Sequence, residues 1–115
     1  MKELVKKLER KPDSYKGQNG KVGVIGGSKE FSGAPALNAE AALRTGSDLV
    51  KILTSKTVRD VVRSYSENFI VEGFDSGSFD KNASRAAAEL STWANVAVIG
   101  SGLSKNNSEA VKDFA

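Results

Sequence analysis

The chain has 115 residues, with 17 Lys plus Arg against 14 Asp plus Glu, so its formal net charge is +3. This length suits one small domain and excludes a two-domain enzyme with an interdomain cleft. Histidine and cysteine are absent, which excludes Ser-His-Asp and Cys-His nucleophiles, zinc sites built on those residues, and disulfides. No apolar run approaches the roughly 20 residues of a membrane span, and the start lacks a signal-peptide apolar region. We therefore expect a soluble, cytoplasmic protein without a membrane partner.

The positive charge is concentrated at the start of the chain. Residues 1–21 hold seven Lys or Arg and three acidic residues, giving +4, whereas the remaining 94 residues sum to −1. A nucleic-acid binder typically combines a basic stripe with aromatic residues that stack on bases, and aromatic residues are few here. We interpret residues 1–14 as a solvated basic helix and linker, and we expect no nucleic-acid partner.

From residue 22 onward, short apolar runs alternate with helical periodicity. The runs 22–26, 49–53, 69–71 and 96–100 predict buried strands. The helical segments are 34–45 with Pro35 in its first turn, a segment capped by Ser55, the segment after Asp80, and 108–114. Buried strands separated by helices predict an α/β fold with a parallel sheet flanked by helices. Because the last helix reaches Ala115 without a cap or a following strand, we interpret the chain as the front part of a longer domain.

Two glycine-rich loops directly follow predicted strands. The first, residues 26–35, leaves a strand and enters a helix, and the second is residues 100–103. Ligands of open parallel sheets bind beyond the carboxyl ends of the strands. With Pro35 at the first helical position, Ala34 would be the cap, and alanine leaves the free amides of the helix available to an anionic group. Glycine after a strand also serves ordinary turn geometry, but two such loops at one edge favour a ligand site.

Other candidates carry less information. Neither loop matches a P-loop or the Gly-x-Gly-x-x-Gly motif of dinucleotide folds. Glu40 and Arg44, one helical turn apart, predict a surface ion pair. Asp48 is interpreted as a turn residue rather than a catalytic one, and Trp93 as a core residue.

The glycine loops carry a family resemblance. The run from Lys16 to Ser28, continued through Phe31–Leu37 and Ala41–Val50, resembles the NAD(P)H-hydrate dehydratases of the ribokinase-like superfamily. Residues 100–103 fall where that family has its second glycine loop, and Tyr65-Ser66-Glu67-Asn68 resembles its archaeal branch. The resemblance covers nearly all of residues 15–115. It implies a three-layer α/β fold, a parallel sheet flanked by helices, of which these residues are the N-terminal portion.

The resemblance implies a metabolite-repair lyase. Family members use ADP or ATP, with Mg²⁺, to phosphorylate the hydroxyl of hydrated NADH or NADPH, and phosphate is then eliminated. The substrate-contacting alanine of the family's Gly-Ala-Pro motif matches Ala34, and a glycine of its second loop matches Gly102. We expect Gly27, Ser28 and Gly33 to shape the same pocket.

Some features of the family are missing. Tyr15 stands where many members have histidine, and Ser101 replaces a proline, which should loosen the second loop. The family's Gly-x-Gly-Asp motif, which carries the nucleotide site and the catalytic base, is absent from these 115 residues, as is its substrate-contacting histidine. Phosphoryl transfer needs positioned phosphates, charge neutralisation and a group that orients the hydroxyl. We therefore expect no catalytic residue in this chain, no metal ligand, and no activity of the chain alone.

The missing catalytic motif determines which partners and which alternative functions we expect. We expect the chain to bind hydrated NADH or NADPH and to act with the missing C-terminal half or as a homo-oligomer. One alternative is a non-catalytic dinucleotide-binding or interaction module. Another is a fragment of a different ribokinase-like kinase that acts on a small hydroxylated molecule.

Overall fold

The computed structural model describes residues 12–75 and 80–103, so the basic helix predicted at the start of the chain and the helix predicted over 108–114 lie outside the described residues. Strands and helices alternate along the described chain. They are β1 (Lys21–Ile25), α2 (Gly33–Arg44), β2 (Leu49–Ser55), α3 (Lys56–Ser64), β3 (Ile70–Phe74), α4 (Lys81–Trp93) and β4 (Val96–Ile99). All strand pairs are parallel, and the strand order is β3-β2-β1-β4. The α/β prediction with a parallel sheet is confirmed.

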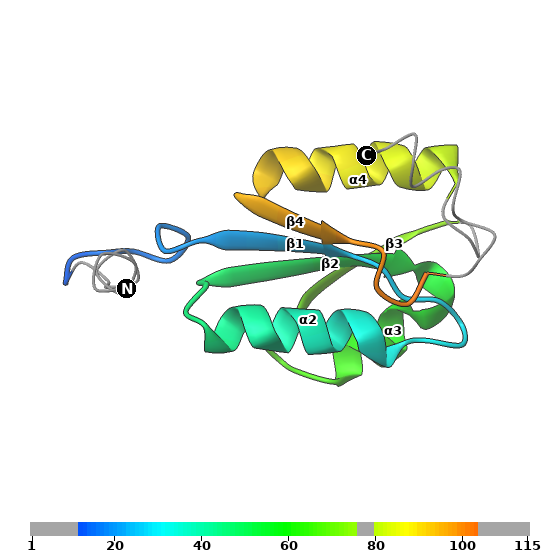
Figure 1. Ribbon diagram of the computed structural model, residues 1–115, viewed down its shortest axis with the longest axis horizontal. Coiled ribbons are helices and arrows are strands. Elements are labelled where there is room, and N and C mark those ends of the chain that lie inside the picture. The colour runs from blue at the N-terminus through cyan, green and yellow to red at the C-terminus, as the bar shows by residue number, and fades with distance from the viewer. Residues whose placement is uncertain (1–11, 76–79, 104–115) are drawn as a thin grey trace.

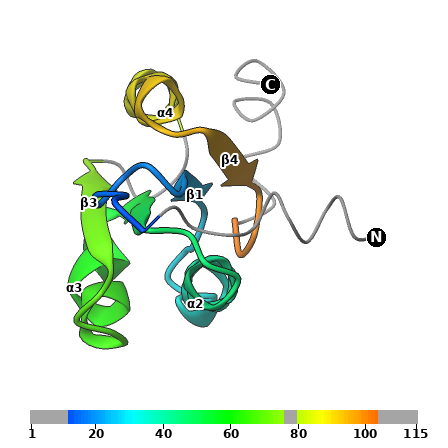
Figure 2. The same cartoon turned by 90° about the vertical axis from the view of Figure 1, so that its left-hand side faces the viewer.

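The molecule has three layers. Helices α2 and α3 cover one face of the sheet and α4 covers the other, as Figures 1 and 2 show from two directions. Successive strand residues point to opposite faces. In β1, Val24 therefore joins the apolar cluster under α2 and α3, whereas the next residue, Ile25, joins the cluster under α4. Both side chains are fully buried, so the sheet has a packed core on each side.

Small residues let α4 pack closely on the sheet. Ala83 and Ala87 are fully buried on the inner face of α4. A Cβ atom at Gly23 of β1 would lie 3.0 Å from Cγ of Leu90, so glycine at this position allows the helix to approach the strand. Trp93, predicted in the core, is half-buried against the same cluster, with Nζ of Lys51 4.4 Å from the centre of its ring.

Three boundaries differ from the sequence prediction. Helix α2 begins at Gly33 with Ser32 as its N-cap, so Ala34 is a first-turn residue and not the cap. Proline is accepted at the third position because the amides of the first turn have no partner within the helix. Strand β2 runs to Ser55, which also caps α3 as predicted by accepting the Thr57 amide.

Strand β3 also runs further than predicted, from Ile70 to Phe74. Its buried residues Val71 and Phe74 enclose the exposed Glu72 and the half-buried Gly73, which interrupt the apolar pattern. Oε1 of Glu72 lies 3.5 Å from Nζ of Lys51 in the neighbouring strand, so an ion pair links the two paired strands.

No helix within residues 12–75 and 80–103 is long and apolar enough to cross a membrane.

Strand β4 forms one edge of the sheet and is exposed. Val96 and Val98 pair in register with Val22 and Val24 of β1, so they point to the face that α2 and α3 cover. They are nevertheless 60% and 38% exposed, because α2 packs mainly on β1 and β2, and α3 packs mainly on β2 and β3. This apolar edge agrees with the expectation that the chain associates with further polypeptide, which stays a prediction.

Candidate functional site

The two glycine loops meet at the carboxyl edge of the sheet, because the strands that they follow, β1 and β4, are neighbours. The Gly27 amide donates to the Ser101 carbonyl at 2.8 Å, and the Gly100 amide donates to the Ile25 carbonyl at 3.1 Å. Nδ2 of Asn38, in α2, donates to Oγ of Ser101 at 2.5 Å. In Figure 1 the orange segment after β4 accordingly lies beside the start of α2. Both loops therefore lie at the same edge of the sheet, as predicted.

Ala34 and Gly102, the two leading site residues from the sequence, are in close proximity. A Cβ atom at Gly102 would lie 3.0 Å from the Ala34 Cβ and 2.8 Å from the Phe31 carbonyl oxygen. Gly102 also has a φ of +76°, a conformation that favours glycine. A larger residue at either position would push the second loop away from the first turn of α2.

The remaining predicted residues surround this contact. Gly27 is buried with a φ of +87°, and a Cβ atom there would lie 2.6 Å from Oγ1 of Thr54. Ser28 is 4% exposed, and its hydroxyl has no hydrogen-bond partner among the described residues. Gly33 is exposed, and a Cβ atom added to it would meet nothing within 4 Å. Gly27 and Ser28 are therefore the buried part of the first glycine loop, whereas Gly33 faces open space.

The start of α2 lacks a side-chain cap. The Ser32 side chain makes no capping hydrogen bond, and its hydroxyl instead lies 3.0 Å from the hydroxyl of Tyr65, which follows α3. The first-turn amides and the positive end of the helix dipole therefore have no acceptor from the N-cap side chain. The sequence prediction placed Ala34 at the N-cap and expected free amides there. In the structure the N-cap is Ser32, and its side chain likewise leaves the first-turn amides without an acceptor. Helix N-termini of this kind are suited to anionic groups.

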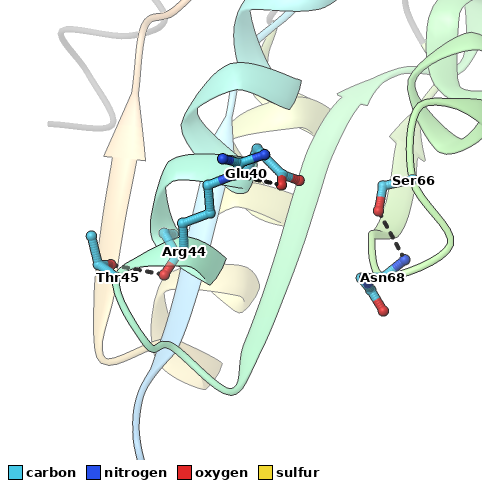
Figure 3. A network of polar contacts seen from close by, with 6 residues as sticks. Glu40, Arg44, Thr45, Ser66 and Asn68 are labelled. Carbon is cyan, nitrogen blue, oxygen red and sulfur yellow. Dashed lines mark hydrogen bonds and ion pairs between the residues drawn. The ribbon is translucent and has the colours of Figure 1, made fainter.

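An open groove of about 690 Å³ runs from the start of α2 toward the α3–β3 connection. Its lining is mostly apolar and includes Leu37, which is 75% exposed, and Tyr65, which is 50% exposed. Figure 3 shows the polar residues near it, with Glu40 on α2 and Ser66 on the α3–β3 connection. Sequence reasoning missed this groove, because it depends on how two helices lie side by side.

Glu40 and Arg44 form the ion pair predicted from their spacing. Nε of Arg44 lies 3.0 Å from Oε1 of Glu40, and the two side chains are 79% and 44% exposed, respectively (Figure 3). Exposed pairs of this kind contribute a few tenths of a kcal/mol to stability. The interpretation as a surface pair is confirmed.

Asp48 lies at the opposite, amino edge of the sheet. Its Oδ2 accepts the amides of Gly17 and Asn19, both at 3.0 Å, and the Asn19 side-chain amide at 3.1 Å. The carboxylate thus ties the loop before β1 to the start of β2. This geometry confirms the interpretation of Asp48 as a turn residue.

The carboxyl edge offers hydrogen-bonding groups. Its groups are backbone amides, small side chains and the hydroxyls of Ser28 and Thr54. Across residues 12–75 and 80–103, no cluster of three or more acidic residues is placed to hold a metal ion. Thr54 was missed in the sequence, although its place at the carboxyl end of a strand is a signal that could have pointed to it.

Comparisons with known proteins agree on one family. The sequence model of the NAD(P)H-hydrate dehydratase family matches residues 22–115. An ADP-dependent (S)-NAD(P)H-hydrate dehydratase of Natrialba magadii is 40% identical over 95 residues, which are 83% of this chain and 37% of the relative. A bifunctional NAD(P)H-hydrate repair enzyme of Methanothermobacter thermautotrophicus is 36% identical over 108 residues, 94% of this chain and 21% of the relative. The chain thus spans well under half the length of these relatives.

Solved structures give the same fold. A ribokinase-like superfamily protein from Enterococcus faecalis superposes with a TM-score of 0.74 at 25% identity, over 93% of this chain and 36% of the other. A hypothetical protein from Streptococcus mutans gives a TM-score of 0.68 at 30% identity, over 89% of this chain and 35% of the other. The architecture is therefore that of a part of a ribokinase-like domain.

Proposed function

Because the chain belongs to the NAD(P)H-hydrate dehydratase family, we propose that it supplies part of the substrate site of an enzyme that repairs hydrated NADH or NADPH. The proposed reaction is phosphorylation of the hydrate's hydroxyl by ADP or ATP, followed by elimination of phosphate. The observation that carries the proposal is the contact of the two glycine loops, with Gly102 against Ala34 at the uncapped start of α2.

In this proposal Ala34 and Gly102 form one wall of the substrate site. Their small size lets the dinucleotide approach the backbone amides of the two loops closely. Gly27 and Ser28 shape the loop beneath the substrate, and Gly33 leaves the open side accessible. The positive end of the α2 dipole favours the negative charge of a dinucleotide at this place.

The phosphoryl donor belongs to another part of the enzyme. The described residues do not fit a Mg²⁺–nucleotide site, because no group of acidic residues among them is placed to hold a metal ion. We assign no catalytic step to them and place ADP or ATP, and any Mg²⁺, on polypeptide that carries the Gly-x-Gly-Asp motif, in the same or another chain. A cytoplasmic location and a homo-oligomer are part of the same proposal; the former is supported by the lack of cysteine.

Substitution of Gly33 by glutamate tests the binding site. Because a side chain at Gly33 enters open space, Gly33→Glu should block the site without disturbing the core. We expect the affinity for hydrated NADPH, measured by calorimetry, to fall at least tenfold, or about 1.4 kcal/mol. The matched control is Ala41→Glu, which adds the same charge at an exposed position further along α2 and should bind as the unaltered chain does. Equal affinity of Gly33→Glu and the unaltered chain would contradict the proposal.

An activity assay separates the alternatives. With ADP or ATP, the 115-residue chain alone should not restore NADPH from its hydrate, whereas addition of a polypeptide with the Gly-x-Gly-Asp motif should restore the reaction. Binding of the hydrate without restoration under any pairing would favour a non-catalytic dinucleotide-binding module. Phosphorylation of sugar-type substrates in place of the hydrate would favour another ribokinase-like kinase.

A further inference from the structure

Two buried hydroxyls at the carboxyl edge have no hydrogen-bond partner. Thr54, at the carboxyl end of β2, is 0% exposed, and Ser28, in the first glycine loop, is 4% exposed. Neither Oγ1 of Thr54 nor Oγ of Ser28 has a partner within residues 12–75 and 80–103. A buried hydroxyl without a hydrogen bond is costly, and such groups at a candidate site call for an explanation.

The Thr54 hydroxyl lies against the first turn of α2. The position that a Cβ atom of Gly27 would take is 2.6 Å from Oγ1 of Thr54 and 3.1 Å from Cγ of Pro35. Pro35 is the third residue of α2, so the hydroxyl and the helix start flank the same point. Ser28 follows Gly27 directly in the chain. The Thr54 hydroxyl and the backbone at Ser28 are therefore both next to Gly27, which packs against the first turn of α2.

We propose that Thr54 and Ser28 are hydrogen-bond donors of an anion site that receives a phosphate group of the dinucleotide. The assignment of the phosphate to the dinucleotide rests on the proposed function. The hydroxyls supply directional donors, and the helix start supplies free amides and the positive end of its dipole. Hydrogen bonds to a charged acceptor are stronger than those between neutral groups, so an anion suits two unsatisfied donors.

The site opens by movement of the first glycine loop. Because both hydroxyls are buried, an anion reaches them when the segment from Gly27 to Phe31 shifts. That segment is tied down lightly: the Gly27 amide bonds to the Ser101 carbonyl and the Phe31 amide to the Ser28 carbonyl. Lys29, Glu30 and Phe31 are exposed, so few side chains anchor it.

The charges of the loop neither create nor oppose the site. Lys29 and Glu30 carry opposite charges, and both are exposed to solvent. The preference for an anion therefore comes from the hydroxyl donors and the helix start rather than from the net charge of the loop.

A third buried hydroxyl provides a control. Ser91 of α4 also has no hydrogen-bond partner among the described residues, but it lies in the last turns of its helix, away from the glycine loops. An unpartnered hydroxyl alone is therefore no site. Thr54 and Ser28 differ from Ser91 because they share one loop and one helix N-terminus.

The test is Thr54→Val, compared with Thr54→Ser and Ser91→Ala. Thr54→Val removes the hydroxyl and keeps the branched shape. We expect it to leave the unfolding temperature of the ligand-free protein unchanged or higher, and to weaken binding of hydrated NADPH about tenfold. Thr54→Ser, which keeps the hydroxyl, should retain most of the affinity, and Ser91→Ala should retain all of it. A lower unfolding temperature of Thr54→Val with unaltered affinity would show that the hydroxyl serves the fold, and would overturn the site.

A second titration, with inorganic pyrophosphate, separates the sources of the phosphate. Weaker binding of both pyrophosphate and hydrated NADPH by Thr54→Val supports the proposal. Weaker binding of pyrophosphate alone overturns the assignment to the dinucleotide. If the unaltered chain binds no hydrated NADPH, the proposed function fails, and pyrophosphate binding that depends on Thr54 still supports an anion site. If it binds hydrated NADPH and Thr54→Val binds equally well, only the inference about Thr54 fails.

Discussion

Polar side chains at the two ends of the sheet differ in their hydrogen bonding. At the amino edge, one carboxylate oxygen of Asp48 accepts three hydrogen bonds from Gly17 and Asn19. At the carboxyl edge, the Ser28 and Thr54 hydroxyls have no partner among the described residues, and the Ser32 side chain does not cap α2. The carboxylate at the amino edge is therefore hydrogen-bonded, whereas two buried hydroxyls at the carboxyl edge are not.

This contrast separates stability from binding. Satisfied polar groups fix a loop and add to the free energy of unfolding, whereas unsatisfied buried groups lower it and call for an explanation, of which a bound ligand is one. The amino edge is accordingly interpreted as structural and the carboxyl edge as the binding edge. Substitutions at the two edges should have different effects on unfolding and on ligand affinity.

The largest effect is expected from Gly26→Ala, which separates the two glycine loops. A Cβ atom at Gly26 would overlap the carbonyl oxygen of Ser101, and backbone cannot move aside cheaply. We expect a loss of about 3 kcal/mol in the free energy of unfolding, measured with denaturant, together with loss of hydrated NADPH binding. The control, Gly33→Ala, meets nothing within 4 Å and should stabilise α2 slightly. Equal stabilities of the two variants would contradict the contact between the loops.

Asp48→Ala should destabilise the protein without affecting the ligand. It removes the acceptor of three hydrogen bonds at the amino edge, and we expect a loss of about 2 kcal/mol, since part-buried donors regain some bonds from water. Denaturant unfolding measures the loss, and calorimetry under folding conditions should give the affinity of the unaltered chain. A variant of normal stability with weakened binding would contradict the interpretation of the amino edge as structural, because Asp48 would then contribute to binding and not to stability.

The smallest effect is expected from the Glu40–Arg44 pair, which belongs to neither edge. Because both side chains are substantially exposed, Arg44→Ala should change stability by about 0.3 kcal/mol. A double-mutant cycle with Glu40→Ala measures the coupling, which should fade at high salt. A coupling above about 1 kcal/mol would show that the pair does more than cover the helix surface.

The sequence predicted the architecture because the signals for it are local. Apolar runs such as 49–53 and the helical spacing after Ser55 mark buried strands and helices, and the parallel sheet follows from their alternation. The boundaries were less accurate where the pattern is interrupted. The predicted strand ended at residue 71, because Glu72 and Gly73, a charged residue and a glycine, resemble a turn in the sequence. In the structure β3 continues through both residues, and Glu72 forms an ion pair with Lys51.

The sequence alone predicted only part of the arrangement at the carboxyl edge. Ala34 and Gly102 came from the loops and from the family resemblance, and their proximity depends on β1 and β4 being neighbours, which no local pattern reveals. Thr54 belongs to β2 and reaches the site only through the sheet register.

The most direct test is an amide chemical-shift titration of the 115-residue chain with hydrated NADPH. We expect the largest shifts at Gly27, Ser28, Gly33 and residues 100–103, with the Gly17 and Asn19 amides of the amino edge unchanged. Shifts confined to the amino edge, or no shifts at saturating hydrate, would contradict the assignment of the carboxyl edge as the binding site.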